Sequence, residues 1–78
     1  MNWRDRITAD KEVLSGKPVI KGTRISVELI LELLAEGWNE QMVLESYPNI
    51  TQEDLKAVFA YLRDGMQQDL YLPFRRSA

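Results

Sequence analysis

The chain has 78 residues and a net charge of −2, from ten Lys or Arg and twelve Asp or Glu residues, and it contains neither cysteine nor histidine. This length corresponds to one small domain, and 45% apolar residues suffice for one compact core. The missing residue types exclude a disulfide framework, a thiolate nucleophile, a Cys-type zinc site and an imidazole base. We therefore expect a binding or regulatory module, not an enzyme, with no cofactor and no metal site.

No apolar run approaches the roughly 20 residues that a membrane helix needs. The N-terminus is charged and is not followed by an apolar stretch, so it is not a signal peptide. We expect a cytoplasmic protein with no membrane contact.

The charge is unevenly distributed. Residues 1–24 hold six cations and three acids, residues 25–69 hold two cations and nine acids, and residues 70–78 add two arginines. A basic front, an acidic middle and a basic end suggest separate surfaces for separate partners, although solvated faces of a small protein can also segregate in this way.

Residues 7–25 are dense in turn residues and predict short β-strands separated by glycine turns. One alternative pairs Val13-Leu14 with Val19-Ile20. The other turns Val19-Ile20 at Lys21-Gly22 onto Arg24-Ile25. Strands of two or three residues are not stable alone, so either pair must pack on helices.

From residue 26 the apolar spacing becomes helical. Ser26 is expected to cap the first helix and Gly37 to end it. Asn39 caps a short second helix that ends before Pro48. The first helix carries its apolar stripe at i, i+3, i+4 and i+7: Val27, Ile30, Leu31 and Leu34.

Thr51 is expected to cap a third helix, with Asp54 completing a variant of the capping box. Gly65 is expected to break or kink this helix. Its predicted apolar stripe comprises Leu55, Val58, Phe59 and Leu62.

These elements predict a single, mainly α domain over residues 1–78. A short β segment (7–25) precedes a three-helix body (26–64), and a C-terminal tail follows (65–78). Three helices joined by short turns form a tri-helical helix-turn-helix-like pattern.

In such a pattern the third helix is the element that enters DNA. Gln52 could read adenine and Lys56 could reach a phosphate, but Glu53 and Asp54 would face a polyanion. The two acids are equally explained by a favourable interaction with the helix dipole.

The β segment offers a more basic surface, because its cations lie in or beside glycine turns. It could meet nucleic-acid phosphates or an acidic protein site. The alternative is structural: the glycines only make turns, and Arg24 pairs with a carboxylate of the helical body. The residues concerned are Gly16, Lys17, Pro18, Lys21, Gly22, Thr23 and Arg24.

The tail mixes aromatic, leucine and arginine side chains, which are the residue types that anchor protein interfaces. We expect it either to bind a partner or to fold back on its own core. Its candidate contact residues are Tyr71, Leu72, Phe74, Arg75 and Arg76. Exposed apolar residues such as Trp38 and Leu72 also make a homodimer plausible.

The run from Gly16 to Ile25, Gly-Lys-Pro-Val-Ile-Lys-Gly-Thr-Arg-Ile, is followed by an apolar helix, Gly37, Tyr47-Pro48 and Thr51-Gln52-Glu53-Asp54. This combination closely resembles a family of short bacterial and archaeal proteins known as the domain of unknown function 433. The resemblance covers about residues 7–62. Ser26 stands where the family often has proline, and a serine cap serves the same helix start.

The resemblance implies a helix-turn-helix-like fold and a role like that of VapB-type antitoxins, whose genes commonly neighbour a PIN-like ribonuclease toxin. PIN-like nucleases hold divalent metal in a carboxylate cluster. A bound protein can inhibit one by covering its cleft or by placing Arg or Lys among the acids. We expect the tail to make this contact and the hairpin to be mainly structural. The alternative function is a DNA-binding transcriptional autorepressor, acting through the helix-turn-helix or the basic hairpin.

Overall fold

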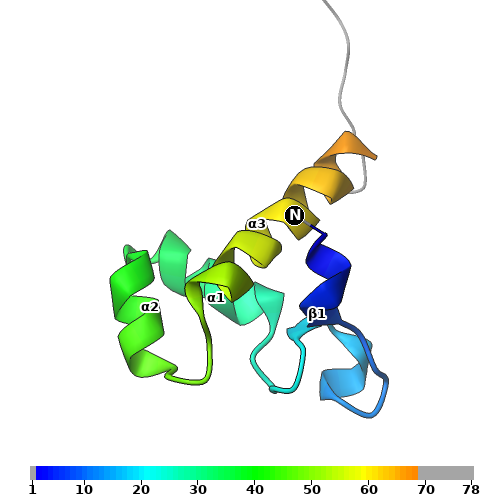
Figure 1. The fold of residues 1–78 in the computed structure, drawn as a ribbon, viewed down its shortest axis with the longest axis horizontal. Helices are drawn as coiled ribbons and strands as arrows, with labels where there is room; N and C mark the ends of the chain where they lie inside the picture. The colour runs from blue at the N-terminus through cyan, green and yellow to red at the C-terminus, as the bar shows by residue number, and fades with distance from the viewer. Residues whose placement is uncertain (1, 69–78) are drawn as a thin grey trace, which may run out of the picture.

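The computed structural model describes residues 2–68 (Figure 1). Three helices follow a two-stranded antiparallel pair and two short 3-10 turns, so the prediction of a mainly α fold with a short N-terminal β segment is confirmed. In chain order the elements are η1 (Trp3–Asp5), β1 (Ile7–Thr8), η2 (Leu14–Gly16), β2 (Val19–Ile20), α1 (Val27–Ala35), α2 (Glu40–Ser46) and α3 (Gln52–Gln67).

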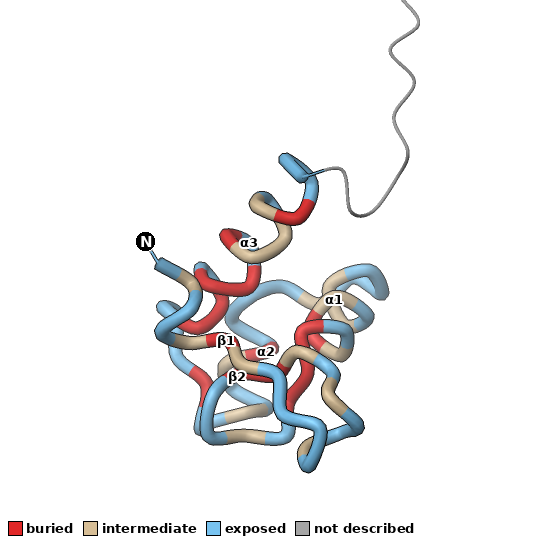
Figure 2. The backbone as a smooth tube through the Cα atoms, turned by 90° about the vertical axis from the view of Figure 1, so that its right-hand side faces the viewer, coloured by how far each residue is buried: buried red, intermediate tan, exposed pale blue. Residues whose placement is uncertain are grey.

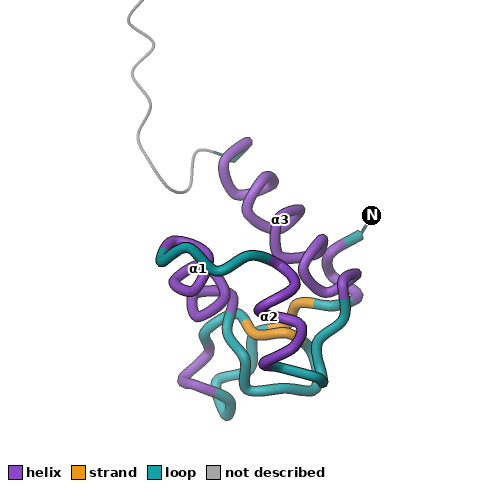
Figure 3. The backbone as a smooth tube through the Cα atoms, turned by 90° about the vertical axis from the view of Figure 1, so that its left-hand side faces the viewer, coloured by secondary structure: helices purple, strands orange, loops and turns teal. Residues whose placement is uncertain are grey.

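The strand partner differs from both predicted pairings. β2 pairs with β1 in the register Ile7↔Ile20 and Thr8↔Val19, and the two strands lie side by side near the centre of the domain (Figure 3). Val13-Leu14 does not form a strand. Leu14 has a φ of +48° and the two residues after it also have positive φ, a run of backbone that no strand adopts.

The second predicted pairing is present only in part. Val19 forms an isolated antiparallel bridge with Ser26, and the N–H of Ile20 donates to the carbonyl of Ile25 (2.9 Å). The chain therefore turns back on itself between β2 and α1, as one alternative predicted. β1 completes the sheet on the other side of β2.

All three predicted helix caps are confirmed. The side-chain oxygens of Ser26 and Asn39 accept from the N–H groups of Leu29 and Met42, each at 2.9 Å. At Thr51 the capping box is complete, because Thr51 and Asp54 each bond the other's backbone N–H. Within residues 2–68, none of the helices combines the length and apolarity that a membrane crossing requires.

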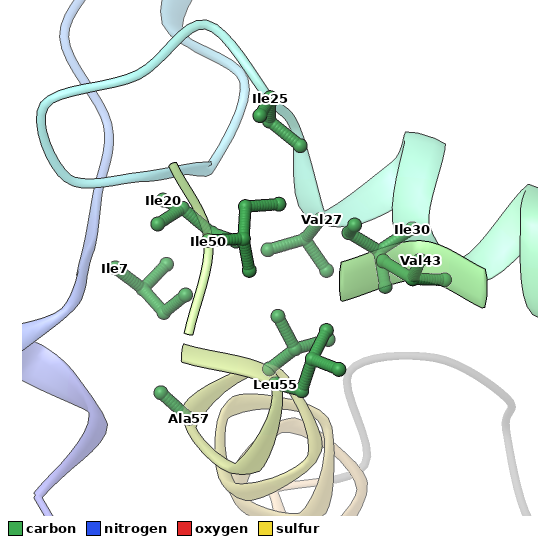
Figure 4. Packing of buried hydrophobic residues seen from close by; sticks show 10 residues of the cluster. Ile7, Ile20, Ile25, Val27, Ile30, Val43, Ile50, Leu55 and Ala57 are labelled. Carbon is green, nitrogen blue, oxygen red and sulfur yellow. The ribbon is translucent and has the colours of Figure 1, made fainter. Parts of the chain in front are cut away.

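The core is formed where the strand pair, the loops and all three helices converge (Figure 4). Ile30, Val43 and Val58 are fully buried, one from each helix. Burial is concentrated in the strand pair and along α3 (Figure 2). The buried cluster comprises Ile7, Ile20, Ile25, Val27, Ile30, Val43, Ile50, Leu55, Ala57 and Val58.

Two expectations for the third helix are wrong. α3 continues through Gly65 to Gln67, so Gly65 neither breaks nor kinks it, and the body extends three residues beyond the predicted boundary. One glycine costs a helix only about 1 kcal/mol, and contacts between Trp3 and the preceding turn hold this end in place. Phe59, predicted to be part of the core stripe, is 45% exposed.

Candidate functional site

The basic hairpin, residues 16–25, is held by a dense set of hydrogen bonds. The N–H of Lys21 donates to the carbonyl of Arg6 (2.8 Å), and the N–H of Thr23 donates to the carbonyl of Ile20 (3.0 Å). The Thr23 hydroxyl also donates to that carbonyl (2.7 Å) and accepts from the N–H of Ile25 (3.0 Å). These bonds fix the backbone on both sides of the turn.

Gly22 has a φ of +81° at the tip of this turn, a left-handed conformation that glycine adopts without steric cost. A Cβ at this position would meet no atom within 4 Å, so the requirement for glycine is conformational and not one of space. Gly16, with a φ of +87°, ends the preceding 3-10 turn and leads through Lys17 into Pro18. The carbonyl of Pro18 accepts from the N–H of Val27 (2.9 Å), which ties the hairpin to the start of α1.

The side chains of Lys21 and Arg24 are exposed on this rigid turn. Within residues 2–68, neither has a carboxylate within 4 Å, so the predicted pairing of Arg24 with the helical body does not occur there. Lys17 does pair with Glu28 (3.0 Å), but both side chains are mostly exposed and the pair contributes little. The hairpin thus presents two cations that are available to an external partner.

Asp54 points into the fold and not toward solvent. The sequence predicted instead that it would face a DNA ligand and repel it. Its side chain is 11% exposed, and Oδ1 accepts from Nη1 of Arg6 at 3.0 Å. Its second oxygen accepts from the N–H of Thr51 (2.9 Å). The charge of Asp54 is therefore used inside the fold, where it joins the N-terminal segment to the start of α3.

A cluster around Trp3 holds the chain start against the C-terminal half of α3. The Trp3 indole N–H donates to Oδ2 of Asp64 (2.6 Å), and its ring meets that of Tyr61 edge-on at 4.9 Å. The Arg4 guanidinium lies over the Trp3 ring, 4.4 Å from its centroid. The pKa of Asp64 is lowered, mainly by the Trp3 hydrogen bond and also by Arg63 and Arg4, while desolvation acts in the opposite direction.

Trp3 is partly buried against the core. Trp38, which the homodimer prediction treated as exposed, is also partly buried against the core. No local pattern indicates the partners of Trp3, because they follow it by about 60 residues. The sequence places Asp64 and Tyr61 on the third helix but does not indicate that they contact Trp3.

The exposed face of α3 carries an alternation of cationic and apolar side chains. Lys56, Phe59, Arg63 and Met66 follow at i, i+3, i+7 and i+10, a spacing that brings them to one side of a helix. Phe59 and Met66 are 45% and 66% exposed. We call these four residues the α3 face. Sequence reasoning missed it because it assigned Phe59 to the core.

The partner-binding residues predicted in the tail, Tyr71 to Arg76, lie outside the described residues. Their assignment remains a prediction. Among residues 2–68, no group of His, Cys, Asp or Glu side chains is arranged to hold a metal ion.

Comparison with known proteins identifies the family of this chain. The profile of the family described as "Protein of unknown function (DUF433)" matches residues 7–62, which include the hairpin and most of the helical body. The chain belongs to the DUF433 family. Trp3, Asp64 and Met66 lie outside the matched residues.

Two proteins illustrate the similarity. A crystal structure of a DUF433 member from Anabaena variabilis superposes with a TM-score of 0.76 at 29% identity, covering 83% of this chain and 64% of the other. The uncharacterized protein y4eO of Sinorhizobium fredii is 29% identical over 58 residues, which are 74% of this chain and 26% of that protein. The chain thus spans about a quarter of y4eO and less than two thirds of the Anabaena protein.

Proposed function

We propose that this DUF433 protein is an antitoxin-like inhibitor that binds a PIN-like ribonuclease toxin of a type II toxin–antitoxin pair. The observation that carries the proposal is the pair of exposed cations on the basic hairpin, Lys21 and Arg24, held on a hydrogen-bonded turn without carboxylate partners in residues 2–68. A cleft lined by metal-binding carboxylates is a target of complementary charge.

The tail supplies the second part of the proposed contact. Tyr71, Leu72 and Phe74 would anchor the complex, and Arg75 and Arg76 would stand among the acids of the nuclease in place of metal. An arginine inserted among carboxylates binds well only when desolvation is offset by close pairing. In the proposed complex the apolar side chains that precede Arg75 and Arg76 would exclude water from this pairing.

The proposal predicts a PIN-like nuclease gene beside that of this protein, and the test is co-purification of the full chain with that nuclease. A truncation after Gln68 removes the tail and leaves all of α3 in place. We expect the truncated protein to lose most of its affinity for the nuclease. Unchanged binding would refute the tail assignment and move the contact to the hairpin.

The alternative function is a DNA-binding autorepressor. Because Asp54 points inward, α3 would repel DNA less than its sequence predicted. With that charge neutralised by Arg6, Glu53 is the one acid left exposed in the first turn of α3, beside Gln52 and Lys56. A gel shift against the protein's own promoter over a salt series tests this function. Absence of a shift at low salt would exclude it for the free protein, because phosphate contacts are strongest there.

A further inference from the structure

The strongest unassigned feature is the α3 face, formed by Lys56, Phe59, Arg63 and Met66. Phe59 and Met66 are among the few large apolar side chains of residues 2–68 that are extensively exposed. Ten residues of helix separate Lys56 from Met66, so the face extends about 15 Å along the axis. The last turns of α3 extend beyond the rest of the domain (Figure 1).

The α3 face carries the positive charge of the helical body. Residues 25–69 hold nine acids and only two cations, Lys56 and Arg63, and both lie on this face. Each has one carboxylate neighbour: Lys56 pairs with the exposed Glu53 at 3.4 Å, and Arg63 with the half-buried Asp64 at 3.3 Å, and both cations remain mostly exposed. An acidic body therefore concentrates its positive charge beside its exposed phenylalanine and methionine.

We propose that the α3 face is a docking surface for the nuclease and that it binds in an apolar groove of the nuclease that is bordered by carboxylates. This inference rests on the proposed function and extends the contact from the tail onto the described helix. A helix laid in a groove is recognised through apolar anchors on one face, and Phe59 and Met66 stand at i and i+7. Phe59 and Met66 fill the groove, and Lys56 and Arg63 meet its acidic border.

Interface size supports an extension beyond the tail. The three apolar tail side chains, Tyr71, Leu72 and Phe74, can bury on the order of 500 Å² together. A stable interface buries about 800 Å² on each partner. The α3 face lies just before the tail in the chain and supplies apolar area of the required kind.

Two other occupants fit the face less well. A second copy packed by two-fold symmetry would set the face against itself, so Lys56 and Arg63 would meet the same cationic and apolar side chains of the other chain in place of a border of carboxylates. A DNA duplex would gain from Lys56 and Arg63, but nothing in its phosphate backbone rewards the exposure of Phe59 and Met66.

The experiment measures binding of the full chain to the PIN-like nuclease by isothermal titration calorimetry. The variants are Phe59→Ala, Met66→Ala and Arg63→Glu. Met42→Ala is the matched control, because Met42 is 41% exposed on α2 and removes a similar side chain from a different surface. Melting curves check that each variant is folded. If Phe59→Ala is destabilised, Met66→Ala still tests the surface, because Met66 is the more exposed of the two side chains.

We expect each variant on the α3 face to raise Kd about tenfold or more, while Met42→Ala binds like the wild type. Arg63→Glu should also flatten the salt dependence of the affinity. Tight binding by the wild type together with unchanged binding by Phe59→Ala and Met66→Ala would overturn the docking surface and leave the proposed function intact. Failure of the wild type to bind would overturn both.

Light scattering and a gel shift with the same variants test the other occupants. A wild-type dimer that Met66→Ala converts to a monomer would assign the face to a second copy. A promoter gel shift that Phe59→Ala and Met66→Ala both abolish would assign it to DNA. Either result would overturn the inference.

Discussion

Replacement of Asp54 by alanine should destabilise the protein more than any other exchange of a charged residue within residues 2–68. The carboxylate completes the Thr51 capping box and pairs with Arg6 at 3.0 Å, and it does both while nearly buried. Loss of the hydrogen bond that this carboxylate accepts from the Thr51 N–H costs about 1 kcal/mol. Loss of a partly buried hydrogen bond between charged groups costs about 1.5 kcal/mol more.

The combined loss of about 2.5 kcal/mol is a large part of the total stability of a domain this small. It corresponds to a decrease in Tm on the order of 10–20 °C. Urea unfolding followed by circular dichroism measures the free energy directly, and a double-mutant cycle with Arg6→Gln separates the ion pair from the cap. We expect a coupling of about 1 kcal/mol between Arg6 and Asp54. Additive effects within about 0.3 kcal/mol would refute the ion pair as a stabilising contact.

Three further predictions concern other parts of the fold. Ile30→Val should lower the unfolding free energy by about 1 kcal/mol in urea titrations, since Ile30 is fully buried; no loss would place it outside the core. Thr23→Val removes the hydroxyl that bonds both sides of the hairpin turn, so amide hydrogen exchange at Ile25 should accelerate while α3 stays protected. Trp3→Phe removes the hydrogen bond that lowers the pKa of Asp64. A lowered pKa stabilises the folded state above the unfolded value and loses that effect as pH falls, so the stability gap between wild type and Trp3→Phe should narrow below about pH 4. A gap that is constant from pH 7 to pH 3 would contradict this assignment.

Helix starts were predictable because their determinants are local. Ser26, Asn39 and Thr51 each cap the helix that follows within three residues, and the structure has all three caps. The conformations of Gly22 and Gly37 followed from the same short-range logic, since a turn or a helix end at these points needs positive φ.

The contacts that join the chain ends were not predictable, because they link residues far apart in sequence. Trp3 bonds Asp64 across 61 positions, and Arg6 bonds Asp54 across 48. The strand partner was missed for a related reason: Ile20 bonds Ile25 in the predicted turn, but its strand partner is Ile7, which precedes it by 13 residues. The exposure of Phe59 depends on which side of α3 packs on the core. The predicted apolar stripe covers more of the helix circumference than the core does, so it wrongly included Phe59.

The most direct test of the proposed function is a titration of RNA cleavage. The proposal predicts a PIN-like nuclease gene beside that of this protein; its product is held at fixed concentration with divalent metal and a single-stranded RNA, and the 78-residue chain is added. We predict that cleavage falls in proportion to added protein and stops near a stoichiometric ratio. Cleavage that continues at the same rate in the presence of a large excess of the protein would contradict the proposal.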